Sequence, residues 1–76
     1  YQAQKDFAES ISDYYKMLGS GATPEAWQDI EKGLAKYADK HKGSVLAPYF
    51  LAYQADSLLY AGKTQEAIST LDKAIK

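Results

Sequence analysis

The 76-residue sequence predicts an all-α protein in which four helices form two antiparallel hairpins, stacked as a fragment of an α-solenoid. Three observations predict this fold class. Apolar residues recur at intervals of three and four in four segments, which is typical of amphipathic helices. No segment is rich in β-branched residues at a period of two, so strands are not expected. The stretch GATPEAWQDIEKGL, which begins at Gly21, returns 41 positions later as GKTQEAISTLDKAI from Gly62, which indicates that one structural unit occurs twice.

The first helix is expected at residues 2–18. Its apolar face has the helical spacing i, i+4, i+7 and i+11 and consists of Phe7, Ile11, Tyr14 and Leu18. Glycines at positions 19 and 21 follow this face, and glycine readily adopts the left-handed conformation found just past a helix end. A turn is therefore expected near Gly21.

The second helix is expected from Thr23 to about Lys40. The Thr23 hydroxyl can accept a hydrogen bond from a free amide of the first turn. Pro24 suits the first helical position, where its missing N–H has no helical partner, and Glu25 faces the positive end of the helix dipole. The apolar stripe of this helix consists of Ala26, Trp27, Ile30, Leu34, Tyr37 and Ala38. Trp27 is accordingly expected in the core.

The third helix is expected to start between Ser44 and Ala47, because Pro48 is tolerated only in the first turn of a helix. Its inner face is expected to contain Leu51, Ala55, Leu58 and Leu59. Thr64 is expected to cap the fourth helix. The stripe of that helix consists of Ala67, Ile68, Leu71, Ala74 and Ile75. The chain is thus expected to be one domain, with a first repeat at about 2–42 and a second at about 44–76.

Composition limits the classes of function. At 76 residues, folding hides only about 60% of the surface that the unfolded chain exposes, so a thin core is expected. The net charge is −1, with nine Lys and no Arg, so nucleic acid is not an expected partner. No apolar run approaches the roughly 18 residues of a membrane span. The chain begins with Tyr1 rather than Met, which favours a processed segment and is compatible with an upstream anchor.

Catalysis, metal binding and cofactor binding are not expected. His41 is the only histidine, whereas a metal site needs several ligands at fixed spacing. Asp6, Glu9 and Asp13 lie at i, i+3 and i+7 and are expected to form a solvated acidic face, since nothing near them supplies a nucleophile or an oxyanion donor. No glycine-rich phosphate loop follows a strand. The sequence therefore predicts a protein that is not an enzyme.

The second repeat resembles a tetratricopeptide repeat. Gly62, Ala67, Leu71 and Ala74 have the spacing of that family, in which a glycine ends one helix and small residues let the next helix pack closely. Gln54 departs from the resemblance, because the family usually has an apolar residue there. The period of 41 residues also exceeds the usual length of about 34.

More narrowly, the segments YQAQKDFAESISDYYKML and LAPYFLAYQADSLLYAGKTQEAISTLDKAI resemble the membrane-anchored, periplasm-facing tetratricopeptide-like proteins of bacteria, the YfgM-like group. This resemblance implies a place on the periplasmic face of a bacterial membrane. It also implies that the chain interacts with secretion or envelope-chaperone machinery.

A partner-binding groove is the first hypothesis for a functional site. Four residues of the third helix lie at i, i+4, i+7 and i+11: Tyr49, Tyr53, Asp56 and Tyr60. The resemblance implies that this face lines a concave groove, which Ser12 and Tyr15 would extend from the first helix. Because Tyr53 stands where carboxylate-binding members of the family have asparagine, an acidic tail is not a favoured partner. The alternative is that these tyrosines cover a helix junction with their hydroxyls in water.

Two other functions stay open. The first is self-association through Ile68, Leu71 and Ile75, which have no following helix to cover them in this sequence. A homodimer would then close this face. A more distant alternative is that the chain is a helical accessory part of an enzyme. The identity of a protein or peptide partner is not predicted.

Overall fold

The computed structural model describes residues 2–75, which form four α-helices joined by three connections. The helices are α1 (Gln2–Ser20), α2 (Pro24–Lys40), α3 (Ala47–Tyr60) and α4 (Thr64–Ile75). No strand occurs within this range. The predicted all-α fold class with four helices is confirmed, and each helix begins and ends within about two residues of its expected bounds, the usual uncertainty of helix boundaries.

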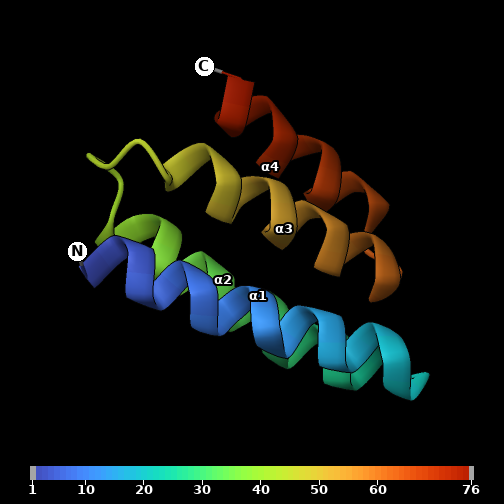
Figure 1. The fold of residues 1–76 in the computed structure, drawn as a ribbon. Helices are drawn as coiled ribbons and strands as arrows, with labels where there is room; N and C mark the ends of the chain where they lie inside the picture. Colours follow the sequence, from blue (N-terminus) through green and yellow to red (C-terminus); the bar gives the residue numbers. More distant parts are fainter. Residues whose placement is uncertain (1, 76) are drawn as a thin grey trace.

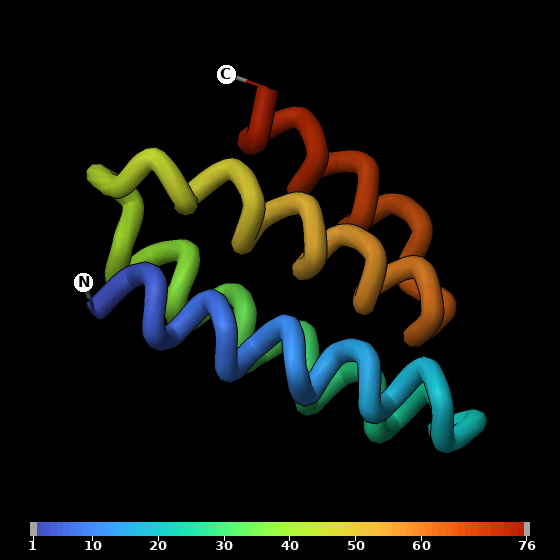
Figure 2. The backbone as a smooth tube through the Cα atoms, viewed as in Figure 1, coloured from blue at the N-terminus to red at the C-terminus, as the bar shows by residue number. Residues whose placement is uncertain are grey.

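The helices lie in two layers (Figure 1). The hairpin of α1 and α2 forms one layer and the hairpin of α3 and α4 the other. Helix α3 is central, because it packs extensively against both α2 and α4 and touches α1 over a smaller area. The molecule measures 32 × 25 × 14 Å, so it is a flat slab. The connection from α2 to α3 crosses between the layers near the N-terminal end of α1 (Figure 2).

Both tight turns are built on glycine. Gly21 and Gly62 have φ angles of 66° and 81°, a left-handed conformation that side chains with a Cβ atom rarely adopt. Thr23 caps α2 as expected, since its Oγ1 accepts a hydrogen bond from the Ala26 amide at 3.3 Å. These glycines let each hairpin reverse within a few residues.

The expected cap at Thr64 is wrong, because Thr64 is itself the first residue of α4. The backbone oxygen of Lys63 accepts the first helical hydrogen bond of α4, from the Ala67 amide at 3.0 Å. In the first hairpin, Pro24 keeps Thr23 out of the helical conformation, because a residue before proline disfavours it. Thr64 precedes Gln65 instead and is free to be helical.

The core consists of three clusters of buried residues. One joins α1, α2 and the end of α3 through Tyr14, Trp27 and Ala61, and a second joins α2 and α3 through Leu34, Ala38 and Phe50. The third joins α3 to α4 through Ala55, Leu58 and Ala67. The predicted burial of Trp27 is confirmed, with 4% of its surface exposed.

The predicted inner faces of α1 and α3 were partly wrong. In α1 the buried residues are Asp6, Ser10 and Tyr14, whereas Leu18 is exposed. In α3 Leu59 is exposed. The buried face of α1 is next to the expected face on the helix surface. Two of its three buried residues, Asp6 and Ser10, are therefore polar. Burial of Asp6 is possible because its carboxylate receives hydrogen bonds from other segments.

In residues 2–75, no helix combines the length and the apolar character that crossing a membrane requires. This agrees with the expectation that this segment contains no membrane span.

Candidate functional site

The predicted groove residues lie on α1 and α3, and they are here named the tyrosine surface. Its members are Ser12, Tyr15, Tyr49, Tyr53, Asp56 and Tyr60. Tyr15 and Tyr53 connect the two helices, since their hydroxyl oxygens lie 3.4 Å apart. Tyr49 packs edge-on against Phe7 of α1, with ring centroids 6.2 Å apart. The structure thus brings together tyrosines that are 38 residues apart in the sequence.

The tyrosines of this surface are exposed but held in place. Tyr15, Tyr49 and Tyr60 are 55%, 57% and 50% exposed. Tyr60 stacks on the buried Trp27, with centroids 4.6 Å apart and planes 23° from parallel. Tyr53 is half-buried and contacts the ring of Tyr14 at 4.9 Å. Ser12 is exposed and has no described contact with the other members.

A buried tyrosine links this surface to the core. The Tyr14 hydroxyl donates a hydrogen bond to the Asp56 carboxylate at 3.3 Å. Burial raises the pKa of Tyr14, and the negative charge of Asp56 raises it further. The hydrogen bond with Tyr15, together with burial, also raises the pKa of Tyr53. Tyr14 and Tyr53 therefore keep their protons at physiological pH, and Asp56 is the charged member of the surface.

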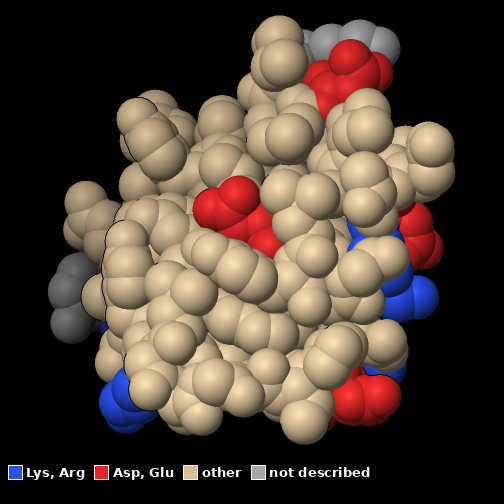
Figure 3. All heavy atoms as spheres, turned by 90° about the vertical axis from the view of Figure 1, so that its right-hand side faces the viewer, with Lys and Arg blue, Asp and Glu red and all other residues tan. Residues whose placement is uncertain are grey.

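Charged side chains are sparse where α1 and α3 end and α2 and α4 begin (Figure 3). In that view an acidic group lies in the middle of an otherwise uncharged face, and both lysines and further acidic groups lie toward its margins. A face of this kind has few ions that a partner would have to desolvate.

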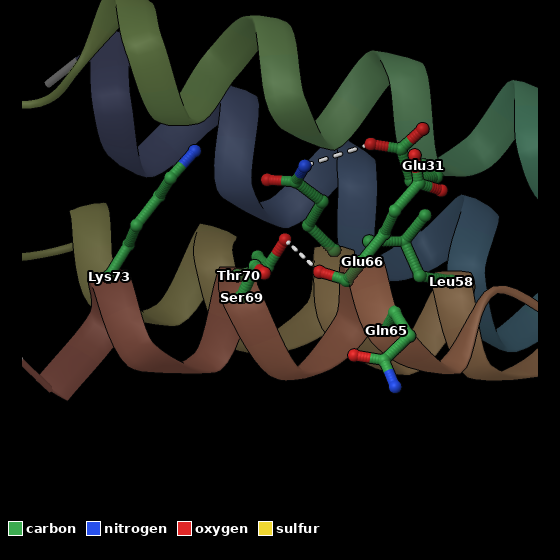
Figure 4. A pocket seen from close by; sticks show the side chains of 8 residues that line it. Glu31, Leu58, Gln65, Glu66, Ser69, Thr70 and Lys73 are labelled. Atoms are coloured by element: carbon green, nitrogen blue, oxygen red, sulfur yellow. Dashed lines mark hydrogen bonds between the residues drawn. The ribbon is translucent and has the colours of Figure 1, made fainter.

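A separate polar groove lies between α2 and α4 with α3 as its floor (Figure 4). Its volume is about 330 Å³, and its lining residues are Glu31, Gln54, Leu58, Gln65, Glu66, Ser69, Thr70 and Lys73. None of these belongs to the tyrosine surface. The Gln54 amide donates to Glu31 at 2.8 Å, which satisfies a polar group at the position where an apolar residue was expected.

The sequence did not predict a buried pair of Asp6 and His41. His41 Nε2 lies 2.7 Å from Asp6 Oδ2, and their side chains are 10% and 6% exposed. Gln2 and Lys40 also donate to this carboxylate, at 2.9 and 3.4 Å. The His41 ring stacks on Phe50 with centroids 5.8 Å apart.

These contacts change the electrostatics of Asp6. The hydrogen bond with His41 is the largest cause that lowers the pKa of Asp6, burial opposes it, and Gln2 and Lys40 lower it further. The expectation of a solvated acidic face was therefore wrong for Asp6, although Glu9 and Asp13 are exposed. No local pattern could have revealed the pair, because Asp6 and His41 are 35 residues apart.

A second exposed feature is the outer face of α4, here named the α4 face and made of Ile68, Leu71 and Ile75. These residues are 56%, 41% and 84% exposed. Together with Ser69 and Asp72 they line an open hollow of about 350 Å³. The α4 face and the tyrosine surface share no residue.

Comparison of the chain with protein-family models, with curated proteins and with solved structures gave no match. Among residues 2–75, no three acidic, histidine or cysteine side chains are grouped as a metal site would require. A functional assignment therefore depends on the surfaces described above.

Proposed function

We propose that the chain is a non-catalytic protein–protein interaction module that binds a peptide or protein partner through the tyrosine surface. The observation that carries this proposal is that Tyr15, Tyr49 and Tyr60 are each at least half exposed, yet packed against neighbouring rings. Rings ordered in advance lose little conformational freedom on binding, and each offers apolar area with a directed hydroxyl. Tyrosine is also enriched among residues that dominate binding energy.

The chemistry of this surface favours a particular kind of partner. Asp56 is its charged member, so a segment with a basic or hydrogen-bond-donating group near apolar side chains is complementary. An acidic tail would meet this carboxylate without a basic residue of the surface to pair with. The partner class that we propose is thus a neutral or mildly basic polypeptide.

The hairpin stack is compatible with a tetratricopeptide-like module, which we propose as its family type. In support, α1 and α3 carry the tyrosine surface together, and both hairpins turn at a glycine with positive φ. A place in the bacterial envelope, next to secretion or chaperone machinery, follows from the sequence resemblance alone and belongs to the same proposal.

The position of the pair formed by Asp6 and His41 supports the non-catalytic part of this proposal. Asp6 and His41 are enclosed, and Asp6 also receives hydrogen bonds from Gln2 and Lys40. The carboxylate is thereby used to hold α1 to the start of the α2–α3 connection. Such an arrangement is typical of a structural polar network.

The test is affinity capture from a bacterial envelope extract, comparing the unaltered domain with the double variant Tyr15→Ala/Tyr49→Ala. These two side chains are chosen because they are the most exposed tyrosines of the surface, at 55% and 57%. Tyr53 is half-buried against Tyr14, and Tyr60 stacks on the buried Trp27, so their loss would remove more packing from the core. Val45→Ala, at a residue 87% exposed outside the surface, is the control. Circular dichroism establishes that all three proteins are folded.

We expect the unaltered domain and the control to retain a partner that the double variant loses. The partner is then purified, and its affinity for the double variant should fall at least about tenfold, which corresponds to about 1.4 kcal/mol. Retention of the same proteins by all three samples would contradict the proposal.

A further inference from the structure

The repeat gives α2 and α4 the same apolar face. Ile68, Leu71 and Ile75 lie 41 positions after Trp27, Ile30 and Leu34. In α2 this face is covered, since Trp27 and Leu34 are 4% and 1% exposed. In α4 the three equivalent residues are all exposed. The molecule therefore contains one covered and one uncovered copy of the same surface.

The covered copy shows what kind of structure fits this surface. Phe50 of α3 packs with Leu34, and Tyr53 packs against both of the clusters that contain Trp27 and Leu34. Ala61, directly after α3, packs with Trp27. The occupant is thus an amphipathic helix with large rings at positions i and i+3, followed directly by a small residue at i+11, where the chain must approach closely.

A second copy of this chain cannot supply that helix by stacking head to tail. Its only free equivalent of α3 is α1, and the positions that correspond to Phe50, Tyr53 and Ala61 hold Glu9, Ser12 and Ser20. All three are polar and exposed. Pressing them against Ile68 and Leu71 would desolvate polar groups without giving apolar contact.

The α4 face also has a suitable shape. The open hollow of about 350 Å³ between Ile68, Leu71 and Ile75 is large enough for an aromatic side chain. On the covered copy, Tyr53 and Ile30 both pack against the cluster of Tyr14, Trp27 and Ala61. A ring in the hollow would bury the aliphatic side chains that now face water.

We propose that the α4 face is a docking site for an amphipathic helix from outside residues 2–75, and that the apolar pattern of this helix is that of α3. This site is separate from the tyrosine surface and does not depend on its role. Burial of the three aliphatic side chains drives the association.

The test uses a peptide of residues 45–63, the α3 segment, added to the whole isotope-labelled domain. Amide chemical-shift changes should occur on α4 around Ile68, Leu71 and Ile75 and saturate with peptide concentration. The peptide with Phe50→Ala/Tyr53→Ala is the matched control. We expect at least about tenfold weaker binding for this control, because truncating buried aromatic anchors typically costs 1.4 kcal/mol or more.

Variants of the domain complete the test. Ile68→Lys and Ile75→Lys alter exposed positions, so the fold should persist, and each should weaken peptide binding at least about tenfold. Tyr15→Ala should leave peptide binding unchanged, which separates this site from the tyrosine surface. Shifts confined to α2, or no saturable shift at all, would overturn the proposal. It would also be overturned if sedimentation showed a dimer of the domain that Ile75→Lys dissociates and the peptide cannot.

Discussion

Trp27 and Ile68 occupy the same position of the repeated stretch, but Trp27 is 4% exposed and Ile68 is 56% exposed. The difference does not lie in their own helices, since α2 and α4 both present an apolar stripe toward one side. It lies in what covers the stripe: α3 lies over α2, and no helix of the described chain lies over Ile68. Sequence periodicity defines an apolar face, whereas a neighbouring element determines whether that face becomes core or interface.

The largest difference in stability is expected between alanine variants of the two equivalent residues, Trp27 and Ile68. Trp27→Ala should cost about 3–5 kcal/mol, because it removes a buried ring from contact with Tyr14 and Tyr60 and leaves a cavity. Ile68→Ala should change the free energy of unfolding by less than about 0.5 kcal/mol. Urea unfolding followed by circular dichroism measures both changes. Similar losses for the two variants would show that the α4 face is covered in solution and would contradict the difference in burial between Trp27 and Ile68.

A second prediction concerns Asp6, which is buried in the first hairpin. The equivalent position of the second hairpin holds Ala47. The pKa of Asp6 is lowered in the folded protein from its ordinary value of 3.8. At acidic pH the unfolded chain therefore binds more protons at this site, and stability rises with pH. The contribution of Asp6 is complete above the unfolded pKa and is lost as the pH falls through the folded pKa.

Asp6→Asn should accordingly lower the thermal midpoint at pH 7 and have a smaller effect near pH 3. Asp13→Asn is the control, because Asp13 lies exposed on the same helix. Thermal unfolding of the three proteins across this pH range measures the difference. An equal loss of stability from Asp6→Asn at both pH values would contradict a role for the ionised carboxylate.

The third prediction concerns the turns of the two hairpins, which have the same glycine conformation. Gly21 and Gly62 both have positive φ, and nothing lies within 4 Å of a Cβ atom added at either position. Replacing either with alanine should cost about 1–2 kcal/mol through backbone conformation alone. Differential scanning calorimetry should show a fall in melting temperature of about 4–8 °C for each kcal/mol. Losses that differ by more than about 1 kcal/mol between the two variants would show that the turns are not equivalent.

Helix positions and the first turn of α2 were predictable because they depend on residues close together in the sequence. Thr23 and Pro24 specify that turn locally, and their effects do not require knowledge of the fold. The tyrosine stripe of α3 was also predictable as a pattern. Its meeting with Tyr15 was inferred only from a family resemblance, since periodicity alone does not say which helices are adjacent.

The rest depended on contacts that are distant in the sequence. Asp6 was assigned to a solvated face because its partner His41 lies in the α2–α3 connection. Phe50 was absent from the expected inner face of α3, although it is fully buried. Helix α3 is covered on several sides, by α1, α2 and α4, so its apolar residues do not reduce to one stripe and periodicity identified only part of its core.

The smallest predicted effect compares Gly33 with Ala74, which are equivalent in the repeat. Gly33 lies inside α2, it is exposed, and a Cβ atom added there would meet nothing within 4 Å. Gly33→Ala should therefore stabilise the protein by about 0.5–1 kcal/mol, because alanine loses less conformational freedom in a helix. Ala74→Gly should cost less than this, because Ala74 lies one residue before the end of α4, where helices fray. Urea unfolding measures both. A larger loss at Ala74 than the gain at Gly33 would mean that the last turn of α4 is held by a contact in solution, which is the condition expected if the α4 face is occupied.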